Sequence, residues 1–195
     1  MTIGIISAMD SEHRRLVERL PELIRRFSPN CIVSTGVAGG IDACLKVTDV
    51  VASQRLVYHD VWCGDGNEYG QVQGFPASYE GCSSLLKHAL SLNEAGMESR
   101  IHSGLVCTGD QFITNRTELD TIKQRFPDGL AVDMESAAIA QICYLYNVPF
   151  LSFRIISDTP GVEDHASQYA DFWGTMAERS FLTIWTFLST LPSNL

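Results

Sequence analysis

Short runs of hydrophobic residues alternate along this chain of 195 residues with longer segments of helical periodicity. The runs are continuous, rich in β-branched residues and only a few residues long, which is typical of strands buried on both faces of a sheet. They predict strands at 2–6, 31–33, 47–57, 101–107, 130–132 and 149–156. Strands that alternate with helices favour an α/β fold, with a largely parallel sheet between helical layers.

Five segments have apolar residues at helical spacing, and they predict helices at roughly 10–27, 81–96, 115–126, 133–146 and 167–190. The first of these segments contains Pro21, whose nitrogen cannot donate to the helix ladder. We therefore expect one helix to stop at Leu20 and another to start at Pro21. Because the pattern contains no repeat, low-complexity stretch or linker, we expect a single domain that spans residues 1–195.

Composition excludes several classes of protein. Hydrophobic residues make up 45% and charged residues 19%, the balance of a globular protein with a sizeable core. The net charge of −9 disfavours nucleic acid and anionic membrane as partners. No apolar run is long enough for a membrane helix, and the N-terminus does not resemble a signal peptide. The six cysteines show no metal-like spacing, so we expect a cytoplasmic protein with reduced thiols and no metal.

Carboxylates follow three of the predicted strands, at the edge of a parallel sheet where chemistry gathers. Glu12 follows the first strand, Glu135 follows the strand at 130–132, and Asp158 follows the last strand. Taken singly, Glu12 and Glu135 could merely complement a helix dipole, and Asp158 could be a turn residue. Residues 34–40, expected to form a glycine-rich loop, and Phe112 and Met134 lie at the same edge. Together these groups suit a site that holds adenine and ribose and moves protons around a glycosidic bond.

Seven motifs of the chain resemble one bacterial enzyme family when they are taken together. They are, in order, Ile3–Glu12, Ser34–Gly40, Tyr58–Asp60, Glu68–Gln71, Gly109–Ile113, Val132–Glu135 and Arg154–Asp158. This set is similar to that of the 5′-methylthioadenosine/S-adenosylhomocysteine nucleosidases. The resemblance implies an α/β three-layer nucleoside-phosphorylase-like fold, with a central mostly parallel or mixed sheet flanked by helices. It also implies a homodimer that needs no cofactor.

The resemblance further implies hydrolysis of the N-glycosidic bond of both nucleosides, with release of adenine. Asp158 would be the general acid that protonates adenine N7, a role that requires it to hold a proton near neutral pH. Glu12 would be the base for the attacking water, and Glu135 would bind the ribose hydroxyls. The other implied substrate-binding residues are Met9, Gly39, Phe112, Ile113, Met134, Arg154 and Ser157, of which Arg154 and Ser157 would steady Asp158.

The chain departs from the family pattern in its N-terminal part. Family members carry additional strands and a glycine-containing turn between the first helix and the next, whereas here the first helix runs straight into Pro21. This shortened part would open the ribose side of the site to water and weaken binding or activity. Val37 also stands where some relatives have serine, which removes one hydroxyl.

Three other functions fit parts of the pattern. A purine nucleoside phosphorylase shares the fold, but phosphate needs positive side chains or free amides, and the segment Met9–Glu12 offers no arginine. An aminodeoxyfutalosine hydrolase would use the same residues. A non-catalytic nucleoside-binding protein would suit the shortened N-terminal part, but it would need no proton donor such as Asp158.

The pocket for the 5′-substituent of the nucleoside is expected to involve two aromatic segments. One is the loop Trp62–Asn67 with Phe75, acting across a dimer interface, and the other surrounds Tyr169. Apolar side chains suit a neutral thioether substituent. The loop Thr159–Asp164 is expected to act as a mobile lid.

Overall fold

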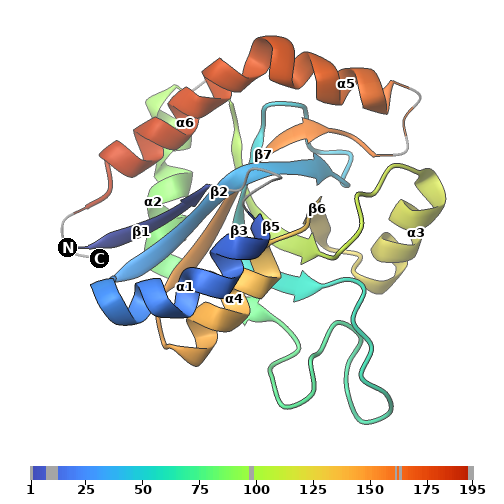
Figure 1. Ribbon diagram of the computed structural model, residues 1–195. Helices are drawn as coiled ribbons and strands as arrows, with labels where there is room; N and C mark the ends of the chain where they lie inside the picture. The colour runs from blue at the N-terminus through green and yellow to red at the C-terminus, as the bar shows by residue number, and fades with distance from the viewer. Residues whose placement is uncertain (1, 8–12, 97–98, 161, 163, 193–195) are drawn as a thin grey trace.

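The computed structural model describes residues 2–7, 13–96, 99–160, 162 and 164–192 (Figure 1). The described residues form seven strands of one mixed sheet. These strands are β1 (Ile3–Ser7), β2 (Cys31–Gly40), β3 (Val50–Tyr58), β4 (Tyr79–Glu80), β5 (Ile101–Thr108), β6 (Gly129–Asp133) and β7 (Phe150–Asp158).

Five of the strands close into a ring. β2 runs parallel to β7, β7 antiparallel to β3, β3 parallel to β5, and β5 parallel to β6. The ring closes where β6 pairs antiparallel with the end of β2, with Gly39 opposite Val132. β1 extends the sheet from β2, and β4 extends it from β3. The predicted mixed, mostly parallel sheet is confirmed, and its closure brings the ends of β2, β5, β6 and β7 together.

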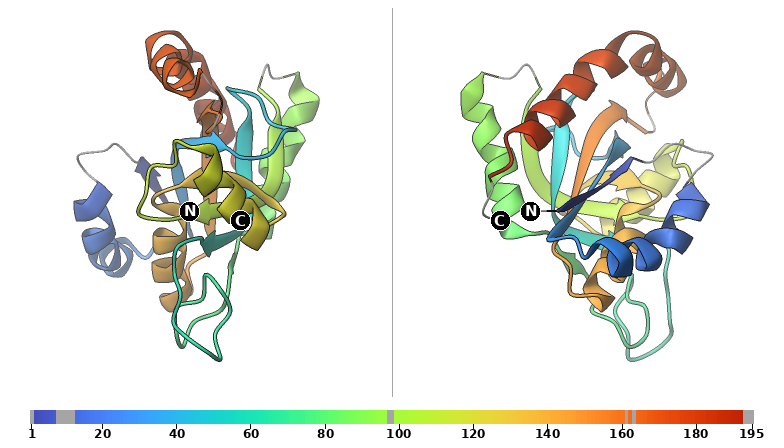
Figure 2. Two further views of the ribbon diagram at one scale, coloured as in Figure 1. Left: turned by 90° about the vertical axis from the view of Figure 1, so that its right-hand side faces the viewer. Right: turned by 60° about the vertical axis from the view of Figure 1, so that its left-hand side comes forward.

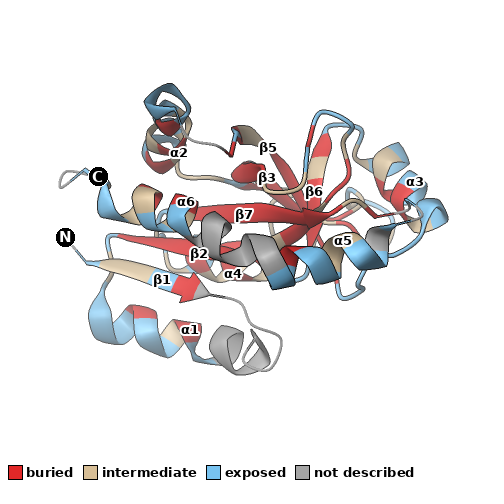
Figure 3. Cartoon of the chain, turned by 90° about the horizontal axis from the view of Figure 1, so that it is seen from above, coloured by how far each residue is buried: buried red, intermediate tan, exposed pale blue. Residues whose placement is uncertain are grey.

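Helices surround this sheet on several sides (Figure 2). α4 packs against α1 and the strands β3, β5 and β7, α2 packs against β3 and β5, and α5 packs against β7. β7 is buried along its whole length (Figure 3). The helix bounds are α1 (His13–Phe27), α2 (Ser83–Ser91), α3 (Arg116–Arg125), α4 (Ser136–Leu145), α5 (His165–Asp171) and α6 (Ala177–Ser189), with a 3-10 turn at Leu92–Ala95 and a π-helical turn at Phe172–Met176.

The predicted break at Pro21 is wrong, because α1 continues through this residue. Leu20 and Ile24, on either side of the proline, are both buried in the core cluster that includes Ile32 and Ile139. Burial on both sides of Pro21 holds the two halves of the helix in line. This packing outweighs the ladder hydrogen bond that the proline cannot make.

The expected glycine-rich loop at 34–40 is also wrong, since these residues continue β2. The segment pairs with β1 through Thr35, with β7 through Gly36 and Ala38, and with β6 through Gly39 and Gly40. A bulge between Ala38 and Gly39 in the pairing with β7 bends the strand. Hydrogen-bonded neighbours on both edges thus make a strand from a sequence whose local composition favours a turn.

Candidate active site

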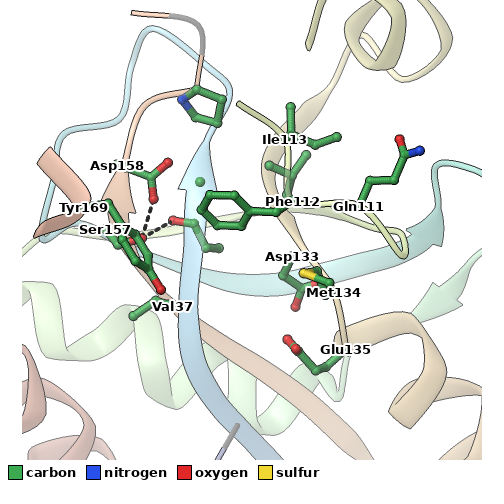
Figure 4. A pocket seen from close by; sticks show the side chains of 14 residues that line it. Val37, Gln111, Phe112, Ile113, Asp133, Met134, Glu135, Ser157, Asp158 and Tyr169 are labelled. Atoms are coloured by element: carbon green, nitrogen blue, oxygen red, sulfur yellow. Dashed lines mark hydrogen bonds between the residues drawn. The ribbon is translucent and has the colours of Figure 1, made fainter. Parts of the chain in front are cut away.

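A pocket lies where the ends of β2, β6 and β7 meet the loop after β5 (Figure 4). It combines three carboxylates with apolar and aromatic side chains. Its walls are Val37, Ala38, Gly39, Gln111, Phe112, Ile113, Val132, Asp133, Met134, Glu135, Ser157, Asp158, Pro160 and Tyr169. The pocket thus brings together seven of the ten residues predicted for the site, from four segments far apart in the sequence.

Asp158 forms one side of the pocket, at the end of the buried strand β7. Asp158 is only 2% exposed, yet it lines the cavity. The Ser157 hydroxyl donates to Asp158 Oδ1 at 2.5 Å and lies 3.4 Å from the Ala38 carbonyl oxygen, which also accepts from it. Ser157 therefore ties the carboxyl group of Asp158 to the backbone of β2.

Glu135 stands on the other side of the pocket, at the N-terminal end of α4. Figure 4 shows Phe112 between Asp158 on one side and Met134 and Glu135 on the other. Glu135 Oε2 lies 3.7 Å from Nη2 of Arg154, whose side chain is completely buried. This guanidinium lies within ion-pair distance of Glu135 and helps to fix the direction of its side chain.

Asp133 anchors the wall from which Met134 and Glu135 project. Its Oδ2 accepts from Arg154 Nε at 2.7 Å, and its Oδ1 accepts from the Thr108 hydroxyl at 2.6 Å. The amide and the hydroxyl of Ser136, the first residue of α4, also donate to this carboxylate. Asp133 therefore connects β5, β6, β7 and α4 in one buried network.

Arg154 was expected beside Asp158, and the structure places it elsewhere. Its hydrogen bonds go to Asp133, Ser136 and Ser34, and its ion pairs go to Asp133 and Glu135. The reason is the twist and closure of the sheet, which carry β6 across β2 and put Asp133 within reach of the guanidinium. Arg154 thus lies behind the wall of the pocket instead of lining it.

Aromatic rings form the open face of the pocket. Phe112 is 54% exposed and meets Tyr169 of α5 edge-on, with ring centroids 5.5 Å apart at 72°. Tyr169 in turn meets Trp173 edge-on at 6.2 Å. An exposed planar ring beside a carboxyl group offers a stacking surface for a planar base.

Gly39 is needed for packing in this structure. A Cβ atom there would lie 2.8 Å from Cγ of Pro160, which is closer than real contacts allow. The ring of Pro160 therefore lies directly on the glycine and forms part of the pocket wall.

Several expected residues lie outside this pocket. Met9 and Glu12 fall outside the described residues. Trp62 stacks on Tyr69 at 6.0 Å, and Phe75 packs against Tyr144 at 6.4 Å, so neither lines the pocket. Of the expected lid, Pro160 is in the wall, whereas residues 161 and 163 are not described.

The described part of the chain also contains features away from this pocket. A second cavity lies between β4 and the end of α4, lined by Tyr79 and Tyr144 among others, and it contains none of the predicted site residues. The described histidines, cysteines and carboxylates form no group of three that could hold a metal ion. None of the described helices has the length and hydrophobicity to cross a bilayer.

Sequence reasoning missed Asp133 and the pocket contact of Gln111, whereas Val37 and Pro160 lie in segments that it had connected with the site. For Asp133 a signal was available, because it lies at the end of a predicted strand directly before a helix, as Asp158 lies at the end of the last strand. Gln111 had no comparable signal, since a pocket wall is made by neighbours that only the fold brings together.

The closed α/β sheet and the carboxylate-lined pocket at its strand ends fit a nucleoside-cleaving protein. Residues 19–189 match the Phosphorylase superfamily model. A 5′-methylthioadenosine/S-adenosylhomocysteine nucleosidase of Geobacillus sp. (strain WCH70) is 38% identical over 170 residues, covering 87% of this chain and 73% of the relative. The corresponding protein of Oceanobacillus iheyensis is 43% identical over 208 residues, covering 86% and 90%. This chain belongs to the 5′-methylthioadenosine/S-adenosylhomocysteine nucleosidase family.

A solved structure agrees with this assignment. The S-adenosylhomocysteine nucleosidase of Streptococcus pyogenes, in complex with 5-methylthiotubericidin, superimposes with a TM-score of 0.87 and 30% sequence identity, covering 98% of both chains.

The Oceanobacillus alignment takes in 86% of this chain, about 168 of its 195 residues, over 208 positions. About 40 aligned positions therefore have no counterpart here, which agrees with a shortened chain.

Proposed function

We propose that this protein hydrolyses the N-glycosidic bond of 5′-methylthioadenosine and S-adenosylhomocysteine, releasing adenine. The observation that carries the proposal is the placement of Asp158 and Glu135 on opposite sides of the exposed ring of Phe112. A nucleoside that stacks its base on Phe112 presents the base to one carboxyl group and the sugar to the other. Family membership supports the same reaction.

Asp158 acts on the base as the general acid that protonates adenine N7. Protonation makes adenine a neutral leaving group, and a positioned acid contributes about 10²–10⁴-fold to such a step. Ser157 orients the carboxyl group for this role, because its hydroxyl donates to Asp158 Oδ1. Phe112 stacks on the purine, and the backbone of Ile113 pairs with its edge.

Glu135 acts on the sugar by accepting hydrogen bonds from the 2′- and 3′-hydroxyls. The bond breaks through an oxocarbenium-like transition state, whose positive charge nearby carboxylates stabilise. Arg154 holds Glu135 in place from behind, and Met134 packs against the ribose. In this proposal Glu12 activates the water and Met9 contacts the sugar.

Water, not phosphate, is the nucleophile that suits this pocket. Among the described residues that line it, three are carboxylates and none is lysine, arginine or histidine. The nearest cation, Arg154, lies behind the wall and is engaged by Asp133 and Glu135. A phosphate ion would therefore meet a negative pocket without a cationic partner.

We infer a single cytoplasmic nucleosidase domain that pairs as a homodimer. Support for pairing comes from exposed apolar side chains on the coil after β3 and at the end of α4, namely Trp62, Tyr144 and Leu145. The apolar coil would then contribute to the pocket for the 5′-substituent across the interface.

The test is release of adenine from 5′-methylthioadenosine, measured by chromatography with and without phosphate. We expect release that is independent of phosphate and that falls at least about 100-fold in Asp158→Asn, because the acid is lost. Asp120→Asn, in an exposed pair on α3, is the matched control and should retain activity. Phosphate-dependent release would contradict hydrolysis. Binding of 5′-methylthioadenosine without release of adenine would favour a non-catalytic binding protein. Parallel assay of aminodeoxyfutalosine tests the related hydrolase.

A further inference from the structure

The loop Gly109–Ile113 follows β5 and carries Phe112 and Ile113 into the pocket. Phe112 is 54% exposed, so its position is not fixed by core packing around the ring. The far end of the loop is held by Ile113, which is buried in a core cluster, and its beginning is held by a separate set of contacts. Gly109 and Asp110 each make one hydrogen bond, Gly109 has one close packing contact, and a third hydrogen bond holds Thr108 directly before them.

Two neighbours in sequence, His59 and Asp60, make most of these contacts. Asp60 Oδ2 accepts from the amide of Asp110 at 2.7 Å. The amide of His59 donates to the carbonyl oxygen of Thr108, directly before the loop, at 2.8 Å. On the opposite side, the amide of Gly109 donates to the carbonyl oxygen of Asp133 at 3.1 Å.

The imidazole of His59 packs directly on Gly109. A Cβ atom on Gly109 would lie 2.3 Å from His59 Nε2 and 2.4 Å from its Cε1, where no side chain fits. His59 is only 4% exposed, and its Nε2 has no hydrogen-bond partner among the described atoms. Burial lowers the pKa of His59 in spite of the nearby carboxylate of Asp60, so the ring is neutral at neutral pH.

We propose that His59 and Asp60 are positioning residues of the nucleosidase site, which set the loop Gly109–Ile113 and hence the stacking surface of Phe112 for the adenine base. Neither residue lines the pocket, so both act through the loop. The inference rests on the proposed function, because it assumes that the planar ligand is adenine. Asp60 fixes the direction of the loop by accepting from the amide of Asp110. His59 fixes the position of the loop backbone by direct contact with Gly109.

The first experiment uses Asp60, which is exposed and whose replacement spares the core. In Asp60→Ala the amide of Asp110 loses its acceptor, and we expect the Kd for adenine to rise about tenfold, with the KM for 5′-methylthioadenosine rising in parallel. Asp60→Asn keeps a carbonyl oxygen at that position and should recover most of the affinity. Glu94→Ala, an exposed acid in the 3-10 turn, is the control and should bind as the wild type.

The second experiment tests the contact between His59 and Gly109 by a double-mutant cycle. Gly109→Ala places a methyl group against the imidazole and should raise the Kd for adenine at least about tenfold. In the background of His59→Ala, where the ring is absent, the same substitution should cost less, because only the contact of 2.8 Å with Asp60 Oδ2 remains. A general loss of stability would not produce this dependence on residue 59, and calorimetric titration with adenine measures it directly.

Two results would overturn the proposal. One is adenine affinity unchanged in Asp60→Ala, and the other is an equal cost of Gly109→Ala in both backgrounds. If His59→Ala does not fold, the series at Asp60 still decides the question. Failure of the proposed function is distinguishable, because the wild type would then release no adenine or bind none.

Discussion

Arg154 is the largest fully buried side chain of the described structure, and it carries a charge. Its Nε donates to Asp133 at 2.7 Å, and the two side chains are 0% and 1% exposed. Removing one partner of such a pair leaves an uncompensated buried charge, which is strongly destabilising. Nη1 of Arg154 has no hydrogen-bond partner among the described atoms, which gives the guanidinium capacity for a further acceptor.

We expect Arg154→Met to lower the free energy of unfolding by about 3–5 kcal/mol, because Asp133 loses its buried counterion. Arg116 offers a matched control, since it makes an Arg–Asp pair with Asp120 at a similar 2.9 Å but with both side chains at least half exposed. Arg116→Met should cost at most about 1 kcal/mol. Urea unfolding measures both values, and equal costs would contradict the role given to the buried pair.

The residues of the site differ in how far sequence could predict them. Asp158, Glu135 and Phe112 follow predicted strands, and their grouping in one pocket required only that strand ends meet. The partner of Arg154 could not be predicted in this way. Asp133 reaches it only because β6 crosses the end of β2, a contact between segments that no local pattern relates.

Helix α1 contains Pro21 in its interior and is nevertheless continuous. Leu20 and Ile24 anchor the helix to the core on both sides of the proline. The arrangement carries a cost, because residue 21 cannot donate to the carbonyl four residues earlier and its ring crowds that turn. For this helix, packing against the core outweighs the low helix propensity of proline.

Replacing this proline should therefore stabilise the protein. We expect Pro21→Ala to raise the free energy of unfolding by about 2–3 kcal/mol, since alanine restores the missing donor and is the best helix former. Glu22→Ala, at the next position in an exposed pair with Arg19, should change it by less than about 0.5 kcal/mol. Thermal and urea unfolding check the difference. An unchanged or lower stability of Pro21→Ala would mean that the helix does not continue through residue 21.

At the scale of the whole molecule, the coil between β3 and β4 carries aromatic side chains, some of which lie on the surface. Trp62 is 54% exposed, and Phe75 connects the coil to Tyr144 at the end of α4, where Leu145 is 57% exposed. Long loops without secondary structure in compact domains are usually functional. Apolar side chains gathered on a coil and an adjoining helix end suit an interface with a second copy.

We expect size-exclusion chromatography with light scattering to give a mass of about 43 kDa, twice the 21.5 kDa of the chain. Leu145→Glu places a charge in the proposed interface and should shift the protein toward the monomer. Leu182→Glu, at an equally exposed leucine of α6, is the control and should leave the mass unchanged. An active monomeric wild type would exclude a pocket shared between subunits. Dissociation by Leu182→Glu alone would move the interface to α6.

The sequence by itself determined the alternation of strands and helices, the acids at the strand ends and the family, because periodicity and short motifs are local properties. Only the tertiary structure decided that residues 34–40 form a strand, that α1 passes through Pro21, and that Arg154 supports Glu135 instead of Asp158. Each of these depends on pairing or burial between segments distant along the chain. Such contacts outweigh local preference once the sheet closes into its ring.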